Sequence, residues 1–423
     1  MTARTVAGGA ETVSLRRFPY PFRAALAICS DIDGTRTRER LLAIQEFLNT
    51  SRDTSMGPGL GLEIGNSFFP YTPDDSLAYF SSRPADRDTL ETLIAAGYVD
   101  CIHSFGDGVN TRARALEALE TFTRRGLRLS VWVDHARAPS NFGKDTSPGA
   151  GDVPGSPIYH ADATLAYGVR FVWKGRGSSL AGRELPYSVR ALTRLFDPRH
   201  PVHTVVGMAR EAAKIGLARA GSRRFAIHRH NRLIDLARLQ DGQAVYEFIR
   251  TNSYWRGLSH GHDNVGLAYV LRRKALSDMV AGGGYTILYT HLGAGPAGPP
   301  ALPPQTQAAL RGVAEVVQAG LLYVTTTARL LAYCLNHRYL RWSQDADAEG
   351  RVRITVHGVD DPLSGLHLPT AEDLQGITFY VPDRHRARLF LGERELTVVE
   401  RHPADDTGRE SVSIPRTFLT YPL

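Results

Sequence analysis

Side chains that can bind a metal or transfer a proton follow five predicted strands of this chain, in each case where the strand ends. In chain order, these side chains are Asp31, Asp33, the polar residues of 63–67, His103, Asp107, Asp134, His135 and His291. When strands and helices alternate in a barrel, the carboxyl ends of the strands meet on one face, where active sites are built. The pattern therefore predicts that these residues converge on a single site.

Three carboxylates and two histidines of this set are of the types that metal-assisted hydrolysis requires. Asp31 and Asp33 occupy alternate positions of an extended segment, so their side chains share a face. One carboxylate can then bind a metal while the other accepts a proton. His103 and Asp107 are four residues apart, which allows both to hold one cation. His291 is available as the acid that protonates a leaving amine, so we expect hydrolysis of an amide.

Three short segments resemble the motifs of a known family, the NodB-homology polysaccharide deacetylases. The segment 30–34 (Ser-Asp-Ile-Asp-Gly) is similar to the first motif, and 103–107 (His-Ser-Phe-Gly-Asp) is similar to the second. The segment 288–291 (Leu-Tyr-Thr-His) is similar to the last motif, an apolar strand that ends in a histidine. The motifs occur in the family's order within residues 19–335. The resemblance implies the family's fold, an incomplete (β/α)7 barrel.

The resemblance also implies a role for each matched residue. Asp31 would be the base that activates water, and His291 the general acid. Asp33 and His103 would bind a divalent transition metal, zinc in the first place, with cobalt, nickel, iron or manganese as alternatives. The implied reaction removes an N-acetyl group from an amino sugar or a related amide, and the implied partner is a small molecule or glycan with an N-acyl group.

Two positions depart from the family's usual motifs. Ile32 separates the two aspartates, as in an Asp-x-Asp branch, and Asp107 stands where the second motif usually ends in histidine. A metal site of Asp33, His103 and Asp107 contains more oxygen than usual, which favours harder divalent ions. His135 is the alternative third ligand, and both choices stay open.

The segment where the third motif of the family would lie matches less well. Arg137-Ala138-Pro139 is close to the usual Arg-x-Pro sequence of that motif. We expect His135, Arg137 and Asn141 to line the substrate site. Trp173 ends another predicted strand, and its indole either stacks on a sugar ring or packs in the core.

Strand-like and helix-like segments alternate between residues 22 and 339, which is typical of a parallel α/β barrel. The expected helices are 38–49, 86–96, 111–125, 264–281 and 305–319. Further expected strands are 169–173, 225–228 and 321–325. The Gly- and Pro-rich segments 139–160 and 291–304 follow two of the candidate site strands, so they are candidate lids.

The pattern changes after residue 342. Short strand-like runs separated by turn signals predict a small all-β, sandwich-like module. These runs are 352–356, 376–381, 388–391, 396–400 and 411–414. We therefore expect an N-terminal extension (1–18), a catalytic barrel (19–342) and an accessory β domain (343–423).

The composition excludes several classes of protein. The net charge is +7 and the basic residues are scattered along the chain, so we expect no nucleic-acid partner. No stretch of about 18 uncharged apolar residues could form a membrane span. Residues 1–17 lack the apolar run of a secretory signal, and we place the protein in the cytoplasm. The three cysteines fit no disulfide framework, so we expect buried free thiols, and a homo-oligomer stays open.

A different family shares the first motif. Asp31-Ile32-Asp33-Gly34-Thr35 also resembles the haloacid dehalogenase-like phosphatases, in which Asp31 would be the nucleophile and Mg²⁺ the metal. That site needs a later acidic pair that follows a strand. The pair at 74–75 lies too early in the chain, and the pair at 360–361 lies in the predicted β module. A third alternative is a sugar-binding relative or a metal-free amide hydrolase with the same barrel.

Overall fold

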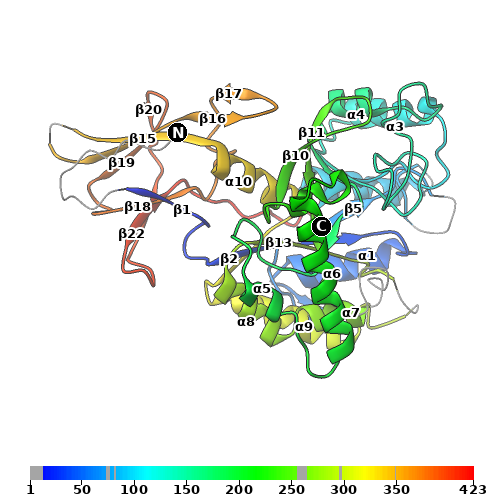
Figure 1. Cartoon of the computed structure of the whole chain (residues 1–423), viewed down its shortest axis with the longest axis horizontal. Helices are drawn as coiled ribbons and strands as arrows, with labels where there is room; N and C mark the ends of the chain where they lie inside the picture. The colour runs from blue at the N-terminus through cyan, green and yellow to red at the C-terminus, as the bar shows by residue number, and fades with distance from the viewer. Residues whose placement is uncertain (1–12, 73–76, 81, 255–263, 295–297, 348) are drawn as a thin grey trace. The chain divides into compact units, whose positions relative to one another are not determined.

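The structure is a computed structural model, and it describes residues 13–72, 77–80, 82–254, 264–294, 298–347 and 349–423 (Figure 1). The chain forms two compact units. The barrel unit comprises Arg23–Leu331 and Phe418–Leu423. The strand unit comprises the residues up to Phe22 and Ala332–Thr417. We expected boundaries after residues 18 and 342. In the structure, the residues up to Phe22 group with Ala332–Thr417, and the last residues, Phe418–Leu423, group with the barrel unit.

One eleven-stranded sheet forms the centre of the barrel unit, in the order β10-β11-β8-β7-β6-β5-β2-β13-β12-β9, with β14 also paired to β2. Its strands are β2 (Ala24–Asp31), β5 (Gly65–Phe68), β6 (Val99–His103), β7 (Val131–Val133), β8 (Phe171–Trp173), β9 (Gly177–Ser178), β10 (Ile234–Arg238), β11 (Ala244–Phe248), β12 (Arg250–Thr251), β13 (Tyr285–Thr290) and β14 (Leu322–Val324). All neighbours run parallel except the edge pair β10 and β11. A separate two-residue ladder joins β3 (Asp53–Thr54) and β4 (Gly57–Pro58).

The sheet curls strongly. Trp173 ends β8, and Tyr289 lies in β13, with four strands between them. In a flat sheet, strands spaced about 4.8 Å apart would hold these residues about 24 Å from each other. Their ring centroids are only 5.9 Å apart. The expected α/β barrel is therefore confirmed as a curled, mainly parallel sheet, whose edge strands β10 and β9 are not paired with each other among the described residues.

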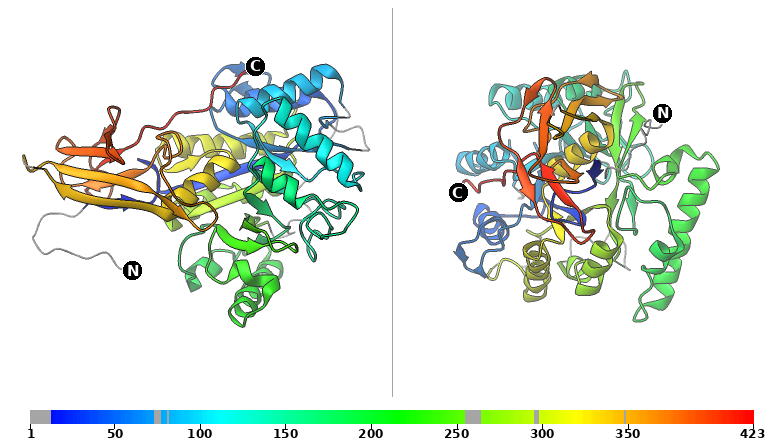
Figure 2. Two further views of the ribbon diagram at one scale, coloured as in Figure 1. Left: turned by 90° about the horizontal axis from the view of Figure 1, so that it is seen from above. Right: turned by 90° about the vertical axis from the view of Figure 1, so that its left-hand side faces the viewer.

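Helices follow most of the strands of the curled sheet (Figure 2). They are α1 (Arg38–Asn49), α2 (Pro84–Ala95), α3 (Arg112–Arg124), α4 (Ala161–Tyr167), α5 (Val189–Thr193), α6 (Pro201–Arg219), α7 (Asn264–Val270), α8 (Arg273–Gly282), α9 (Pro304–Gln318), α10 (Thr327–Tyr339) and the 3-10 helix η1 (Arg223–His228). Thr37 caps α1 by accepting a hydrogen bond from the backbone N–H of Arg40, and Phe47 of this helix is buried in one apolar cluster with Ile28 of β2. No helix of the described residues is both long and apolar enough to cross a bilayer.

The expected helices are largely confirmed, with three differences. The helix expected at 264–281 is divided into α7 and α8. The strand expected at 225–228 is wrong, because these residues form η1. The long helix α6 was not among the expected helices.

The strand unit contains two sheets, in the orders β1-β18-β22-β21 and β15-β16-β19-β20, with β17 paired to β16. Its strands are β1 (Ser14–Arg16), β15 (Leu340–Ala346), β16 (Val352–Asp361), β17 (Gly365–His367), β18 (Thr378–Val381), β19 (Ala387–Leu391), β20 (Arg394–Glu395), β21 (Glu400–His402) and β22 (Glu410–Ser413). The sheets contact each other through Trp342 and Phe379, whose ring centroids are 5.0 Å apart. The run expected at 396–400 is mostly a connection between β20 and β21.

Candidate active site

A cavity of about 680 Å³ lies at the carboxyl ends of the strands of the curled sheet. Its lining includes Asp31, Asp33, His103, His135, Trp173 and His291. Asp31, His103 and Trp173 end β2, β6 and β8, and the other three follow β2, β7 and β13 within two residues. The expectation that these polar residues converge on one face is therefore what the structure shows.

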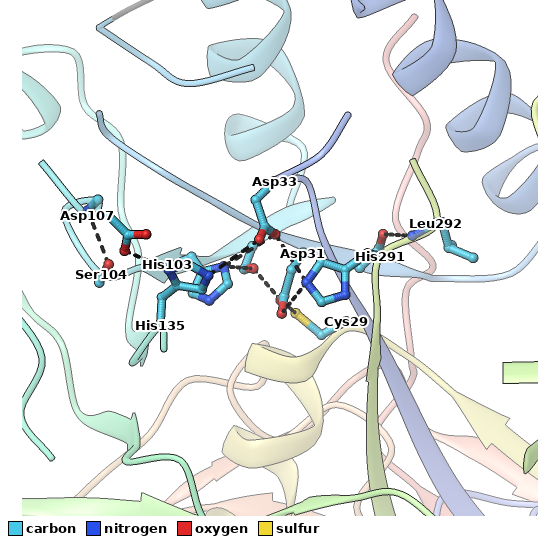
Figure 3. Close-up of polar contacts among 12 residues, drawn as sticks. Cys29, Asp31, Asp33, His103, Ser104, Asp107, His135, His291 and Leu292 are labelled. Carbon is cyan, nitrogen blue, oxygen red and sulfur yellow. Dashed lines mark hydrogen bonds and ion pairs between the residues drawn. The ribbon is translucent and has the colours of Figure 1, made fainter. Parts of the chain in front are cut away.

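The carboxylate of Asp33 is surrounded by imidazole nitrogens (Figure 3). His291 Nε2 lies 3.4 Å from Asp33 Oδ1, and His103 Nδ1 lies 3.9 Å from the same oxygen. His135 Nε2 lies 3.6 Å from Asp33 Oδ2. Three histidines from separate parts of the chain thus face one carboxylate.

The geometry around Asp33 fits a divalent metal. Asp33 Oδ1 is buried and has no hydrogen-bond partner among the described residues. Two ligand atoms about 2.1 Å from a tetrahedral ion lie about 3.4 Å apart, whereas a direct N–H···O bond is about 2.9 Å long. The distances of 3.4 to 3.9 Å between the Asp33 oxygens and the imidazole nitrogens are closer to the spacing of two ligands on one ion than to the length of a hydrogen bond. Carboxylate oxygen and imidazole nitrogen are also donors that divalent transition metals accept.

Asp31 has different surroundings. Its Oδ1 accepts a hydrogen bond of 2.5 Å from Ser67 Oγ, and its Oδ2 lies 3.4 Å from Arg250 Nη1. Burial opposes the charged form, but Arg250, with His103 and His291, holds the pKa of Asp31 below its usual value. Ligand atoms of Asp31, Asp33 and His291 also lie within 4.8 Å of one another. The guanidinium beside Asp31 repels a dication, so the side of Asp33 that faces His103 and His135 suits a metal better.

The three histidines differ in protonation. Burial lowers the pKa of His103 to about 4, so its ring is neutral at pH 7 and can donate a lone pair. Burial acts in the same direction on His291, but Asp33 and Asp31 outweigh it and raise the pKa of His291. The pKa of His135 is also raised against the effect of burial, mainly by Asp107. His291 is therefore suited to carry a proton, and His103 to bind a cation.

Asp107 lies behind His135, away from Asp33. Its Oδ1 is 2.8 Å from His135 Nδ1, and its side chain is half-exposed. Of the two residues that the sequence left open as a third ligand, His135 lies beside Asp33 and Asp107 does not. A carboxylate bonded to the second nitrogen of an imidazole fixes the tautomer and the ring orientation of a metal ligand.

Of three residues expected to contact substrate, two do not line the cavity and the third, Trp173, does. Asn141 is buried and does not line the cavity, because its amide bonds with the backbone N–H and C=O of His135. Arg137 is exposed and is not part of the lining. Trp173 lines the cavity but is buried, and its ring packs 4.6 Å from the guanidinium carbon of Arg250. Its indole therefore serves packing more than stacking on a sugar.

The turn after His103 has a conformation that depends on glycine. Gly106 has a φ of +106°, and a Cβ atom there would lie 1.8 Å from the carbonyl oxygen of Tyr71. This turn places Asp107 against His135. The expected lid 139–160 is also anchored, because Asp134 accepts bonds from the backbone N–H groups of Phe142 and Gly143.

Sequence reasoning missed Arg250, and it assigned no role to Ser67 or Tyr289, although both lie in segments that it singled out, 63–67 and 288–291. Arg250 is completely buried at the start of β12, and its guanidinium carbon lies 4.6 Å from the ring centroid of Trp173 and 5.1 Å from that of Tyr289. The available signal was an arginine directly after the mainly apolar segment 244–249. Cys29 lies beside Arg250, and all three cysteines are buried and free, as expected.

The comparisons with known proteins leave the family open. No family model matches the chain, and no curated protein matches it. Among solved structures, the 4-alpha-glucanotransferase from Thermococcus litoralis is similar at 8% identity and a TM-score of 0.37. The match covers 74% of this chain and 40% of that one. A likeness this distant supports no argument about function.

Proposed function

We propose that the barrel unit is a metal-dependent hydrolase that removes an N-acyl group from an amino sugar or a related amide. The observation that carries this proposal is the Asp33 carboxylate, which three imidazoles face from separate segments of the chain. A second carboxylate, Asp31, lies beside it and is held ionised. The order of the three sequence motifs supports the same function, with a barrel of the polysaccharide deacetylase type.

Asp33, His103 and His135 would hold the metal, and Asp107 would orient His135 from behind. Zinc is the first expectation, and cobalt, nickel, iron or manganese would suit the same donors. A divalent metal held there would supply Lewis-acid chemistry, activating water and polarising the substrate carbonyl.

The remaining groups supply proton transfer. Asp31 accepts the proton of the attacking water, since Arg250 and Ser67 keep its carboxylate charged and fixed in place. His291 gives a proton to the leaving nitrogen, because the neighbouring carboxylates favour its protonated form. The cavity has the size of a site for a small ligand, and the hydroxyl-bearing residues Thr146 and Ser147 contribute to its wall.

The phosphatase alternative has less support. A nucleophilic Asp31 would need a free oxygen, but Ser67 bonds one oxygen and Arg250 pairs with the other. Of the acidic pairs in the sequence, 74–75 lies outside the described residues. Asp361 accepts bonds from the backbone N–H groups at 363 and 364, which is a turn-forming role in the strand unit.

Metal analysis of the full chain tests the proposal. We expect about one equivalent of a transition metal by elemental mass spectrometry, lost in His103→Ala and kept in His357→Ala. His357 is an exposed histidine of the strand unit and serves as the matched control. Acetate release from a panel of N-acetylated amino sugars should follow the metal content. Wild-type protein that binds none of the five metals after reconstitution would overturn the proposal.

A further inference from the structure

The helix α6 is apolar on the side that faces away from the barrel unit. Its buried residues Thr204, Glu211, Ile215 and Ala218 lie on one side. At about 100° per residue, the opposite side is formed by residues that are all exposed. They include Val202, Val205, Val206, Ala209, Ala213 and Leu217. The large members of this outer stripe are 42 to 71% exposed.

This exposure is concentrated in one region. Six of the twelve exposed large hydrophobic residues identified in the described chain lie within 189–217. Scattered single residues of this kind need no explanation, whereas a contiguous apolar surface marks an interaction site. Figure 2 shows α6, in green, at the margin of the barrel unit with a long side uncovered.

The same region has a high net positive charge. Residues 188–224 contain eight basic and two acidic residues, a net charge of +6 within a chain total of +7. The two acids, Asp197 and Glu211, are buried and bonded to Tyr269 and to Lys214. The basic residues are scattered along the chain, as expected, but in this region few acidic residues offset them.

We infer that α6 docks the protein on an anionic lipid surface. The outer stripe would enter the boundary between headgroups and acyl chains, while the basic residues at its sides reach the phosphates. By helical spacing, Arg210 lies along one side of the stripe and Arg219 along the other, while Lys214 is bonded to Glu211. A helix of 19 residues is about 28 Å long, so several headgroups can be contacted at once.

Charge distinguishes this partner from the alternatives. A second copy of the chain would bring two surfaces of net charge +6 together, which opposes association. A nucleic acid would satisfy the arginines but would leave the exposed valines in water. A lipid surface with negative headgroups accepts both the charges and the apolar stripe. The inference goes beyond the proposed hydrolase and does not depend on it.

Vesicle sedimentation with the full chain tests the inference. We expect binding to phosphatidylcholine vesicles that contain phosphatidylglycerol, at least about ten-fold tighter than to phosphatidylcholine alone and weakened by salt. Val202→Glu should weaken binding to the anionic vesicles by about ten-fold. Val398→Glu is the matched control, because Val398 is 69% exposed in the strand unit and Val202 is 71% exposed in α6.

Three results would overturn the inference. The first is wild-type protein that does not bind the anionic vesicles. The second is binding that Val202→Glu and Val398→Glu change equally, which would mean attraction by charge without insertion of the stripe. The third is a dimer in analytical ultracentrifugation that Val202→Glu converts to monomer, which would assign the stripe to a second copy. Thermal unfolding of both variants checks that each is folded.

Discussion

Asp31 and Asp33 are two residues apart, yet their surroundings prepare them for different tasks. Asp31 is the last residue of β2 and is paired with the buried Arg250. Asp33 lies past the strand end, where imidazole nitrogens face it and one oxygen has no hydrogen bond among the described residues. A guanidinium lies beside one carboxylate and three imidazoles beside the other, and this difference is the reason that we propose Asp31 as the base and Asp33 as the ligand.

The substitution Asp31→Asn should separate these two tasks experimentally. The amide cannot accept the proton of water, so we expect kcat to fall by about a hundred- to ten-thousand-fold. The metal content should stay at the wild-type level, because Asp33 and its histidines are unchanged. Elemental mass spectrometry and acetate-release kinetics on the same preparations measure both quantities. Asp33→Asn is the comparison, and it should lose metal and activity together; full activity in Asp31→Asn would contradict the assignment.

A buried histidine away from the cavity should make stability depend on pH. His160 Nδ1 lies 2.8 Å from Thr164 Oγ1 and Nε2 lies 2.8 Å from the carbonyl of Ser140, while burial lowers the pKa of His160 to about 4. The unfolded chain binds this proton near pH 6.5, so the stabilisation is complete above pH 6.5 and is lost as pH falls towards 4. The loss is at most about 3 kcal/mol.

Urea unfolding at pH 7.5 and pH 5.0 checks this dependence. His160→Gln should show a smaller loss of unfolding free energy between the two pH values than the wild type. His203→Gln, at an exposed position of α6, should lose as much as the wild type. Equal losses in wild type and His160→Gln would contradict the prediction.

At the residue scale, the sequence predicted most of the side chains that meet at the cavity, but not the choice between Asp107 and His135. Asp31, Asp33, His103 and His291 follow strands, and parallel strands bring their ends together. The choice between Asp107 and His135 depends on a turn in which Ser104 has a φ of +48°. Residue spacing alone does not specify such a turn, so the geometry had to decide.

At the scale of elements, the turn between β6 and Asp107 should be the part least tolerant of a small change. Gly106→Ala would place a methyl group against the carbonyl of Tyr71 in a backbone conformation that alanine rarely adopts. We expect a loss of more than about 2 kcal/mol of unfolding free energy, together with reduced metal binding. Urea unfolding and metal analysis measure the two effects.

Gly108→Ala is the matched control for this turn. A Cβ atom at Gly108 would meet no heavy atom within 4 Å, and its φ is not in the left-handed region. We expect a change within about 0.5 kcal/mol. If both substitutions had the same small effect, the turn would not position Asp107 in the way described.

Helices with a single apolar face could be predicted from the sequence. Helices with two apolar faces, or too short to show a face, could not. In α3, buried Ala115, Leu119 and Phe122 alternate with polar residues at helical spacing, so this helix was expected. The helix α6 has apolar residues on its inner and outer sides, which hides the period of 3.6 residues. The short apolar run at 225–228 fits a strand or a helical turn equally well, and it forms η1.

At the scale of the whole molecule, the chain ends exchange between the two units. β1 lies near the N-terminus but pairs with β18 of the strand unit. Residues Phe418–Leu423 follow the strand unit in sequence but belong to the barrel unit. Composition along the chain gave no sign of this exchange, because pairing between distant segments is specified by contacts that only the folded chain makes.

The exchange predicts that the last six residues stabilise the barrel unit. The backbone N–H of Leu419 donates to Glu63, and Tyr98 donates its hydroxyl to the carbonyl of Leu419. The ring of Tyr421 is 8% exposed and packs 5.6 Å from that of Tyr98. Tyr421→Ala would leave a cavity in this cluster, so we expect a loss of about 3 kcal/mol of unfolding free energy.

Phe418→Ala provides the matched control, because Phe418 is an aromatic residue of the same tail that is 65% exposed. Its removal should change the unfolding free energy by less than about 0.5 kcal/mol. Deletion of Phe418–Leu423 should cost at least as much as Tyr421→Ala, since Glu63 and Tyr98 also lose their backbone partners. Hydrogen exchange of β5 and β6 locates the effect, because Glu63 and Tyr98, which the tail contacts, lie just before these two strands. Faster exchange there in Tyr421→Ala, and not in Phe418→Ala, would show that the barrel unit requires a segment encoded beyond the strand unit.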